Sequence, residues 1–156
     1  MKGVNSIGAR QPKVVLYMEN QPIINPDQGL SVAQLIVDNG NHWRKILTIL
    51  AKLCCAKDWR LYRDKMLLGD VEQICFSQQL STTAKLHIFA GQRSRQRFGV
   101  NSEHLEKMQA THCNTVHYCQ DASGAWYFYT PYFDYRQFPN ALIAQVKLLT
   151  DRVVLL

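Results

Sequence analysis

The sequence predicts a single α/β domain over residues 1–156, with three layers (α/β/α) around a mainly parallel sheet and a hairpin-like pairing towards the C-terminus. Short apolar segments typical of buried strands alternate with segments whose apolar residues recur every three or four positions. At 156 residues, 47% hydrophobic and 19% charged, the chain has the size and composition of one globular domain. No repeat, low-complexity segment or linker divides it.

The first predicted element is a buried strand that runs into a loop. Val14–Met18 is continuously apolar and is followed by Glu19-Asn20-Gln21-Pro22. Two prolines prevent residues 22–29 from being helical throughout. A helix is then predicted between Ser31, which begins a capping-box signature, and the Asn39-Gly40 stop.

The clearest helix of the sequence follows, from Asn41 to about Ala56. Its apolar residues recur at spacings of three and four, which places them on one face. They are Trp43, Ile46, Leu47, Leu50, Leu53 and Cys54. A shorter helix is predicted for Asp58–Leu67, and Asp70-Val-Glu-Gln73 is expected to begin another near Cys75.

The second half of the chain alternates strands and helices in the same way. Strands are predicted for Lys85–Ala90, Thr115–Cys119 and Ala125–Thr130, the last two joined by a turn at Asp121-Ala-Ser-Gly124. Helices are predicted for Gln92–Phe98, Ser102–Met108 and Asn140–Leu149.

Basic residues exceed acidic ones, and the excess is unevenly distributed. The chain has 18 Lys and Arg against 12 Asp and Glu, a formal net charge of +6. Residues 40–65 have a net charge of +5 and residues 85–97 a net charge of +4. Phosphates attract such clusters and release counterions when bound, so DNA or another phosphate-bearing ligand is the expected partner. The alternative is a basic surface that serves only solubility.

Cysteine and histidine usage does not predict a metal site. Five cysteines, including the vicinal pair Cys54-Cys55, occur without a CxxC motif and are expected to be reduced thiols. The segment His112–Cys119 has the residue types of metal ligands, but on a strand they spread over about 20 Å, too far to converge on one ion. A bend near Asn114 is the alternative that would bring them together. We expect no metal and no cofactor.

An arginine-rich segment, Gly91–Gly99, directly follows the predicted strand Lys85–Ala90. A loop and helix N-terminus at the carboxyl end of a parallel strand offer N–H groups to an anion, and guanidinium groups bind phosphate through paired hydrogen bonds. On a helix, Arg93 and Arg97 share a face while Arg95 points elsewhere. Arg93 and Arg97 are therefore candidate phosphate-binding residues, and a solvated helix face is the alternative.

Half of the sixteen aromatic residues lie between Trp126 and Phe138. Those on the predicted strand alternate between its faces, so both faces are expected to be covered. After Pro131 the chain is expected to form a loop at the end of that strand. The loop residues that are candidates for binding nucleic acid, by stacking or by charge, are Tyr132, Phe133, Tyr135 and Arg136. A loop packed against its own helix is the alternative.

No nucleophile motif is present, since GxSxG and HExxH are both absent. The best-placed carboxylates are Glu19, at the end of the first predicted strand, and Asp134, in the aromatic loop. Both are expected at the carboxyl edge of the sheet, where open α/β sheets have their sites. They are candidate catalytic residues, and simple solvation of both acids is the alternative.

Three segments are similar, in order and spacing, to the uracil-DNA glycosylase superfamily, whose smaller members are single α/β/α domains of comparable length. They are Val14-Val-Leu-Tyr-Met-Glu-Asn20-Gln-Pro22, Leu86-His-Ile-Phe-Ala-Gly91-Gln-Arg-Ser-Arg-Gln-Arg-Phe-Gly99 and Thr130-Pro131-Tyr-Phe-Asp-Tyr-Arg136-Gln-Phe-Pro-Asn140. The first resembles the family's first strand and catalytic loop, and the second its strand, glycine and helix before the last motif. The third stands where the family has His-Pro-Ser, a basic or aromatic stretch, and an Asn that opens the final helix.

This resemblance implies roles for individual residues. In the family an Asp or Asn positions water, a His stabilises charge on the departing uracil, and a loop wedges the duplex while the base is flipped out. Asn20, or Glu19, corresponds to the water-positioning residue, and Asn140 to the Asn that opens the final helix. Thr130 occupies the place of the histidine and Tyr132 that of the serine, which removes the imidazole expected to stabilise the leaving anion.

We therefore expect a nucleic-acid or nucleotide binding protein on a uracil-DNA glycosylase-like scaffold, without standard glycosylase activity. One alternative is an active DNA glycosylase with altered catalytic residues, and another is a protein-interaction module that uses the 132–138 loop. No apolar run approaches the ~20 residues of a membrane span, and the first residues lack the apolar core of a signal peptide. A cytoplasmic location without a membrane partner is expected.

Overall fold

The computed structural model describes residues 4–25, 27, 29–99, 105–109 and 114–154, which form a seven-stranded sheet and five helices. The strands are β1 (Ser6–Gly8), β2 (Val14–Tyr17), β3 (Glu72–Cys75), β4 (Leu86–Ala90), β5 (Glu106–Gln109), β6 (Thr115–Gln120) and β7 (Trp126–Thr130). The helices are α1 (Val32–Asn39), α2 (Asn41–Cys54), α3 (Trp59–Lys65), α4 (Gly91–Arg97) and α5 (Asn140–Val154). Over these described ranges, no helix is long and apolar enough to span a membrane.

The strands lie in the order β1-β3-β2-β4-β7-β6-β5. The β3–β2, β2–β4 and β4–β7 pairs are parallel, whereas the β1–β3, β7–β6 and β6–β5 pairs are antiparallel. The α/β class is confirmed, and so is the hairpin-like pairing at Asp121–Gly124, which joins β6 to β7. The expected mainly parallel sheet is not confirmed, because the three antiparallel pairs are as many as the parallel ones. The tight turn between β6 and β7 can only join antiparallel strands.

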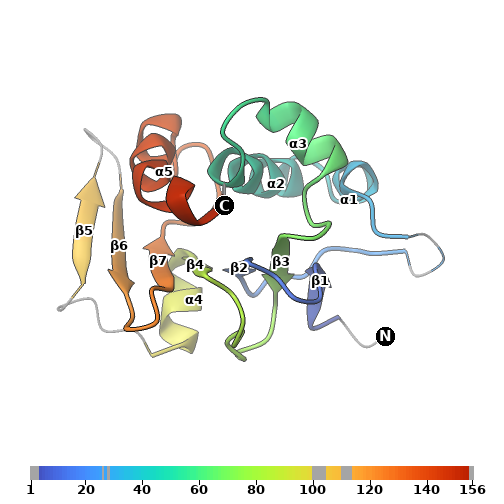
Figure 1. Ribbon diagram of the computed structural model, residues 1–156. Coiled ribbons are helices and arrows are strands. Elements are labelled where there is room, and N and C mark those ends of the chain that lie inside the picture. Colours follow the sequence, from blue (N-terminus) through green and yellow to red (C-terminus); the bar gives the residue numbers. More distant parts are fainter. Residues whose placement is uncertain (1–3, 26, 28, 100–104, 110–113, 155–156) are drawn as a thin grey trace.

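The helices are unevenly distributed over the two faces of the sheet (Figure 1). Helices α1, α2, α3 and α5 gather on one face, and α4 lies on the other. The expected three-layer arrangement is therefore not confirmed over the described residues. The four helices cover the larger part of the hydrophobic core, which includes residues from β2, β3, β4 and β7.

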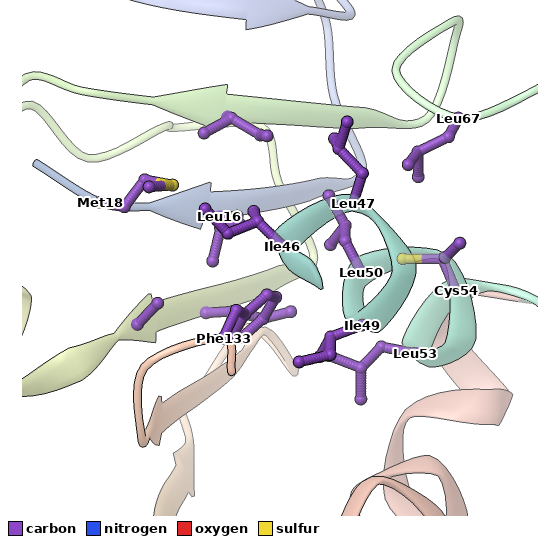
Figure 2. Packing of buried hydrophobic residues seen from close by; sticks show 14 of the residues in the cluster. Leu16, Met18, Ile46, Leu47, Ile49, Leu50, Leu53, Cys54, Leu67 and Phe133 are labelled. Atoms are coloured by element: carbon purple, nitrogen blue, oxygen red, sulfur yellow. The ribbon is translucent and has the colours of Figure 1, made fainter. Parts of the chain in front are cut away.

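Helix α2 is the central element of this core (Figure 2). Ile46, Leu47 and Leu50 are fully buried and lie over β2, and Leu16 of β2 and Met18 just after it belong to the same cluster. Each such side chain contributes about 1.5–3 kcal/mol by leaving water. The apolar spacing of residues 43–54 therefore predicted the buried face of this helix correctly.

Two predicted helices are wrong, because both segments pair into the sheet. The last two residues of the Asp70-Val-Glu-Gln73 signature are the first two of β3, which is held between β1 and β2 and buries Glu72 where a strand core is ordinarily apolar. The described part of Ser102–Met108 includes most of β5, an exposed edge strand whose first residue, Glu106, had favoured a helix start. β1, only three residues long, was not predicted.

The buried carboxyl of Glu72 is satisfied by a local network. It accepts hydrogen bonds from the Tyr62 hydroxyl and, at 3.1 Å, from the backbone N–H of Leu68. Leu68 has a positive φ of 64°, so this bond fixes an uncommon backbone turn before β3. The Cys54 thiol of α2 lies close enough for the Glu72 carboxyl to raise its pKa, in addition to the larger effect of burial. Burial raises the pKa of Glu72, although its hydrogen bonds oppose this change.

The opposite face of the sheet is covered by stacked rings from three strands. They succeed one another in the order Tyr127, His87, Tyr17, Phe89 and Tyr129, with neighbouring centroids 4.5–5.8 Å apart. The Tyr17 hydroxyl accepts a hydrogen bond from the Ser81 N–H and is hydrogen-bonded to Nδ1 of His87 at 2.7 Å. Phe98, just after α4, packs edge-on against Tyr17 and Phe89. Both faces of β7 are thus covered, as the sequence predicted.

We predict that Glu72→Gln changes how stability depends on pH. Because burial raises the pKa of Glu72, the unfolded chain releases this proton first as pH rises above about 4.5. The contribution of the protonated Glu72 carboxyl to the free energy of unfolding is complete below that pH and is lost as pH rises through the folded-state pKa. The amide stays neutral, so the variant should gain in free energy of unfolding relative to the wild type across this range. Urea unfolding between about pH 4 and 8 measures the difference in unfolding free energy. Glu106→Gln on exposed β5 is the control. Parallel pH profiles of stability for wild type and Glu72→Gln would contradict the prediction.

Candidate functional site

A cleft of about 670 Å³ lies at the carboxyl ends of β2, β4 and β7. Chain connections leave β2 and β4 in different directions, since β2 leads over the helical face to β3 and β4 leads into α4. The two strands are neighbours, so a hollow opens between their ends, where open α/β sheets bind ligands. The lining residues are Glu19, Asn20, His42, Ala90, Gly91, Gln92, Arg93, Ser94, Arg95, Asn114, Thr115, His117, Thr130, Pro131, Tyr132 and Gln137.

Four residues singled out from the sequence meet at this cleft. Glu19 and Asn20 follow β2, Arg93 lies in α4, and Tyr132 follows β7. The Arg93 guanidinium and the Glu19 carboxylate are 3.7 Å apart, with side chains 82% and 47% exposed. An exposed pair at this distance contributes little to stability, so the Arg93 charge remains available to an anion.

Tyr132 is held by a histidine from the helical layer. Nε2 of His42, in the first turn of α2, lies 2.8 Å from the Tyr132 hydroxyl, and the two rings stack at 5.5 Å. The Asn20 side-chain amide donates to the same hydroxyl at 3.5 Å. Burial raises the pKa of Tyr132, so the phenol stays protonated near neutral pH. An imidazole, a phenol and an amide thus face the cleft together.

The opposite wall contains a second arginine and a second histidine. The Arg95 guanidinium lies 3.2 Å from Nδ1 of His117 on β6, and both residues are partly buried. Burial lowers the pKa of His117, and the charges of Arg95 and Lys107 lower it further. The imidazole is therefore neutral near pH 7 and accepts a hydrogen bond from the guanidinium, which positions Arg95 at the cleft.

The floor of the cleft depends on a glycine. Gly91 opens α4 with φ +82°, and a Cβ there would lie 3.2 Å from the Tyr132 ring. Ser94, one turn later, is buried and donates to the Tyr17 carbonyl at the end of β2. The Thr130 hydroxyl donates to backbone carbonyls, at 2.8 Å to Pro131 and 3.4 Å to Phe89. The Thr130 hydroxyl is thus engaged in hydrogen bonds to the backbone, and the absence of a side chain at Gly91 leaves room for the Tyr132 ring.

The other predicted residues lie outside the cleft lining. Arg97 donates to the Phe76 carbonyl at 3.0 Å, and the Asp134 carboxylate accepts from Lys45 at 3.2 Å. Phe133 is 1% exposed and packs on Phe138, so its ring has no free face for a base, which corrects that expectation.

The remaining predicted residues of the 130–140 segment are exposed on a neighbouring surface of the helical layer. Tyr135 and Arg136 lie in the turn after Asp134. Asn140 opens α5 and accepts a hydrogen bond from Lys52 at 2.9 Å. Among the aromatic residues of positions 132–138, Tyr135 is the most exposed, at 44%, which leaves little apolar surface for a docking loop.

Several cleft residues escaped the sequence analysis. No sequence motif singled out His42, and His117 entered only as part of the His112–Cys119 segment. Arg95 was expected to point away from the face shared by Arg93 and Arg97. In the structure Arg97 turns towards β3 instead, and Arg93 and Arg95 line the cleft. The short helix places them at opposite sides of the same hollow.

The structure gives no donor set for a metal among the residues it describes, where no three His, Cys, Asp or Glu side chains lie close enough together. His112 and Cys113, part of the histidine and cysteine segment, lie outside the described residues. Cys54, Cys55, Cys75 and Cys119 are free thiols.

Gly91→Ala should disturb the cleft more than an equally strained glycine elsewhere. Gly99 also has a positive φ, +63°, but a Cβ there meets nothing within 4 Å. Gly99→Ala should therefore cost about 1 kcal/mol from backbone strain alone. Gly91→Ala should cost roughly 1–2 kcal/mol more and shift the His42 imidazole NMR signals, because the Tyr132 ring must move. Equal losses in unfolding free energy, with His42 signals unchanged, would contradict this.

Comparison with known proteins identifies a family but gives no activity. No curated protein and no solved structure matches the chain significantly. The family DUF6942, described as a family of unknown function, matches residues 5–151. This match includes every element that forms the cleft, and the chain belongs to the DUF6942 family.

Proposed function

We propose that this DUF6942 protein binds nucleic acid, or a nucleotide, in the cleft at the carboxyl ends of β2, β4 and β7. The observation that supports it best is that Arg93 and Arg95 meet the His42–Tyr132 stack in one hollow of about 670 Å³. Guanidinium groups recognise phosphate, and aromatic rings stack on bases, so the two halves of a nucleotide both have partners. The volume is within the usual range for small-ligand sites.

The phosphate partner of the proposal is the arginine pair. Arg93 has a highly exposed side chain and only a distant carboxylate neighbour. Arg95 is directed by a neutral imidazole, which does not compensate its charge. Two arginines on either side of a hollow form an attractive site for a phosphodiester or a terminal phosphate.

The base partner is the wall of rings and amides. Tyr132 is half-buried and stacked on His42, which leaves it rigid and ready to contact a flat ligand. Amide groups of Asn20, Asn114 and Gln137 also line the hollow. Amides both donate and accept hydrogen bonds, as recognition of base edges requires.

The similarity to the uracil-DNA glycosylase superfamily supports the same proposal. Two of its three matching segments place Asn20 and Tyr132 within hydrogen-bond distance, although 112 residues separate them in the chain. The third contributes Gly91 and the arginines of α4. Within this proposal the scaffold is glycosylase-like, with a layered sheet and its ligand at the carboxyl edge.

Replacing the cleft arginines should weaken binding to oligonucleotides. Arg93→Gln and Arg95→Gln each remove one phosphate partner, so each should lower affinity at low salt roughly three- to tenfold and reduce the slope of log affinity against log salt by about 0.7–0.9. Fluorescence anisotropy with labelled single- and double-stranded oligonucleotides, some containing uracil or an abasic site, measures both quantities across a salt series.

The matched control is Arg10→Gln, which removes the same charge. Arg10 is exposed and precedes β2, at the amino ends of the parallel strands, opposite to the cleft. It should change affinity much less. If Arg10→Gln and Arg93→Gln lowered the affinity equally, binding would depend only on overall charge. Wild-type protein that binds no oligonucleotide at low salt would refute the proposal.

His42 favours a second candidate, hydrolysis of an N-glycosidic bond. The place of the family's histidine is taken by Thr130, but His42 brings an imidazole to the same cleft, which Glu19 and Asn20 also line. A carboxylate or amide can orient water, while the His42–Tyr132 pair can donate a hydrogen bond to a departing base.

Base release from uracil-containing or damaged duplexes at enzyme excess tests this candidate. If it is correct, His42→Ala should lower the single-turnover rate about 10²- to 10³-fold, as loss of an oxyanion donor does. The control is Arg10→Gln, which changes an exposed side chain before β2, at the opposite end of the parallel strands, and should leave the rate unchanged. No base release from any such duplex would exclude a glycosylase and leave the binding proposal intact.

A further inference from the structure

A second basic surface lies beside the cleft, on the helical layer. We define the α2–α3 basic surface by Lys45, Lys52, Lys57, Trp59, Arg60 and Tyr135. The Lys52 ammonium lies 4.8 Å from the centre of the Trp59 ring and 5.8 Å from that of Tyr135. The Arg60 guanidinium lies 4.9 Å from the same Trp59 ring. Two hollows of 280 and 270 Å³ adjoin this surface and share Lys52 and Asn140.

Charges of one sign are crowded here with little compensation. Lys45 is paired with Asp134, and Arg63, below Trp59, with Asp64. Lys52, Lys57 and Arg60 form no ion pair with any carboxylate that the structure describes. Burial lowers the pKa of Lys52, and the neighbouring Arg60 charge lowers it further. A bound anion would relieve this repulsion.

The surface is continuous with the cleft along two segments of the chain. On α2, His42 lines the cleft, and Lys45 and Lys52 follow on the side that faces the 132–140 segment. In that segment Tyr132 lines the cleft, Tyr135 lies under Lys45 and Lys52, and Asn140 accepts from Lys52. From His42 to Lys52 the helix advances about 15 Å. At the 3.4 Å rise of a stacked strand this is roughly four nucleotides.

We infer that the α2–α3 basic surface binds successive phosphates of a polynucleotide strand whose terminal or extruded nucleotide occupies the cleft. This inference rests on the proposed function and narrows its ligand class, from any nucleotide to a polymer. A mononucleotide can fill the cleft but cannot reach Lys52, Lys57 and Arg60, whereas a strand of several nucleotides reaches both. The rings of Trp59 and Tyr135 hold the cations in place, since cations are attracted to aromatic faces.

The test compares a mononucleotide with labelled single strands of increasing length, up to about 10 nucleotides. Wild-type affinity should rise with length until about five nucleotides are reached, one in the cleft and roughly four along α2. The double variant Lys52→Gln/Arg60→Gln should lose about tenfold in affinity for the longer strands and about 1.4 in salt slope. Its affinity for the mononucleotide should equal that of the wild type.

Two further variants keep the test decisive. Lys57→Gln/Arg60→Gln changes only exposed side chains, so it preserves the Lys52–Asn140 hydrogen bond. It should lose about as much affinity for the longer strands as the first double variant, and it replaces that variant in the test if the first is poorly folded. Lys13→Gln is the charge control, because Lys13 is exposed just before β2, at the far end of the sheet.

The outcomes separate this inference from the proposed function. If Arg93→Gln weakens oligonucleotide binding while both surface variants bind every length like the wild type, the inference is overturned and the proposed function stands. If wild-type protein binds no nucleic acid, both are overturned. The inference is supported if the surface variants lose affinity increasingly with strand length while Lys13→Gln binds every length like the wild type.

Discussion

The arrangement of the site depends on the position of β2, which pairs in parallel with β3 on one side and with β4 on the other. All four residues of β2 are fully buried, with α2 over one face and the ring stack over the other. Its neighbours fix its direction, so the polar residues that follow it must emerge beside the end of β4. There the first turn of α4 and the Thr130–Tyr132 segment arrive from the same edge. The cleft is thus a geometric result of parallel pairing, and the polar side chains at these strand ends determine its chemistry.

The helical layer contributes to function as well as to the core. Helix α2 presents a buried apolar face to β2, and from the same turns it presents His42 to the cleft and Lys45 and Lys52 to solvent. A rigid, well-packed helix therefore fixes the relative positions of an imidazole and two ammonium groups. The short 132–140 segment lies alongside and is anchored by buried Phe133 and Phe138. These two buried rings anchor the segment that carries the more exposed Tyr132 and Tyr135.

Local patterns in the sequence predicted most elements of the fold, and the errors have physical causes. The long apolar period of α2, the apolar run of β2 and the turn at Asp121–Gly124 are each determined by nearby residues, so they could be predicted. β3 could not, because its buried Glu72 is tolerated only through partners on α3 and the preceding turn. For the cleft, the strand ends predicted from the sequence include Glu19, Asn20, Arg93 and Tyr132, which line it in the structure. His42, Arg95 and His117 reach the cleft through tertiary packing, for which no local pattern exists.

The position of Cys54 has a chemical consequence. Its thiol is completely buried at the end of α2, beside Glu72, and both burial and this carboxyl raise its pKa. Alkylating reagents attack the thiolate, so Cys54 is protected while α2 stays packed on β3. Any motion that separates them exposes the sulfur to water and to reagent. The rate at which Cys54 is modified therefore reports the opening of the core beneath the proposed strand-binding surface, without an added label.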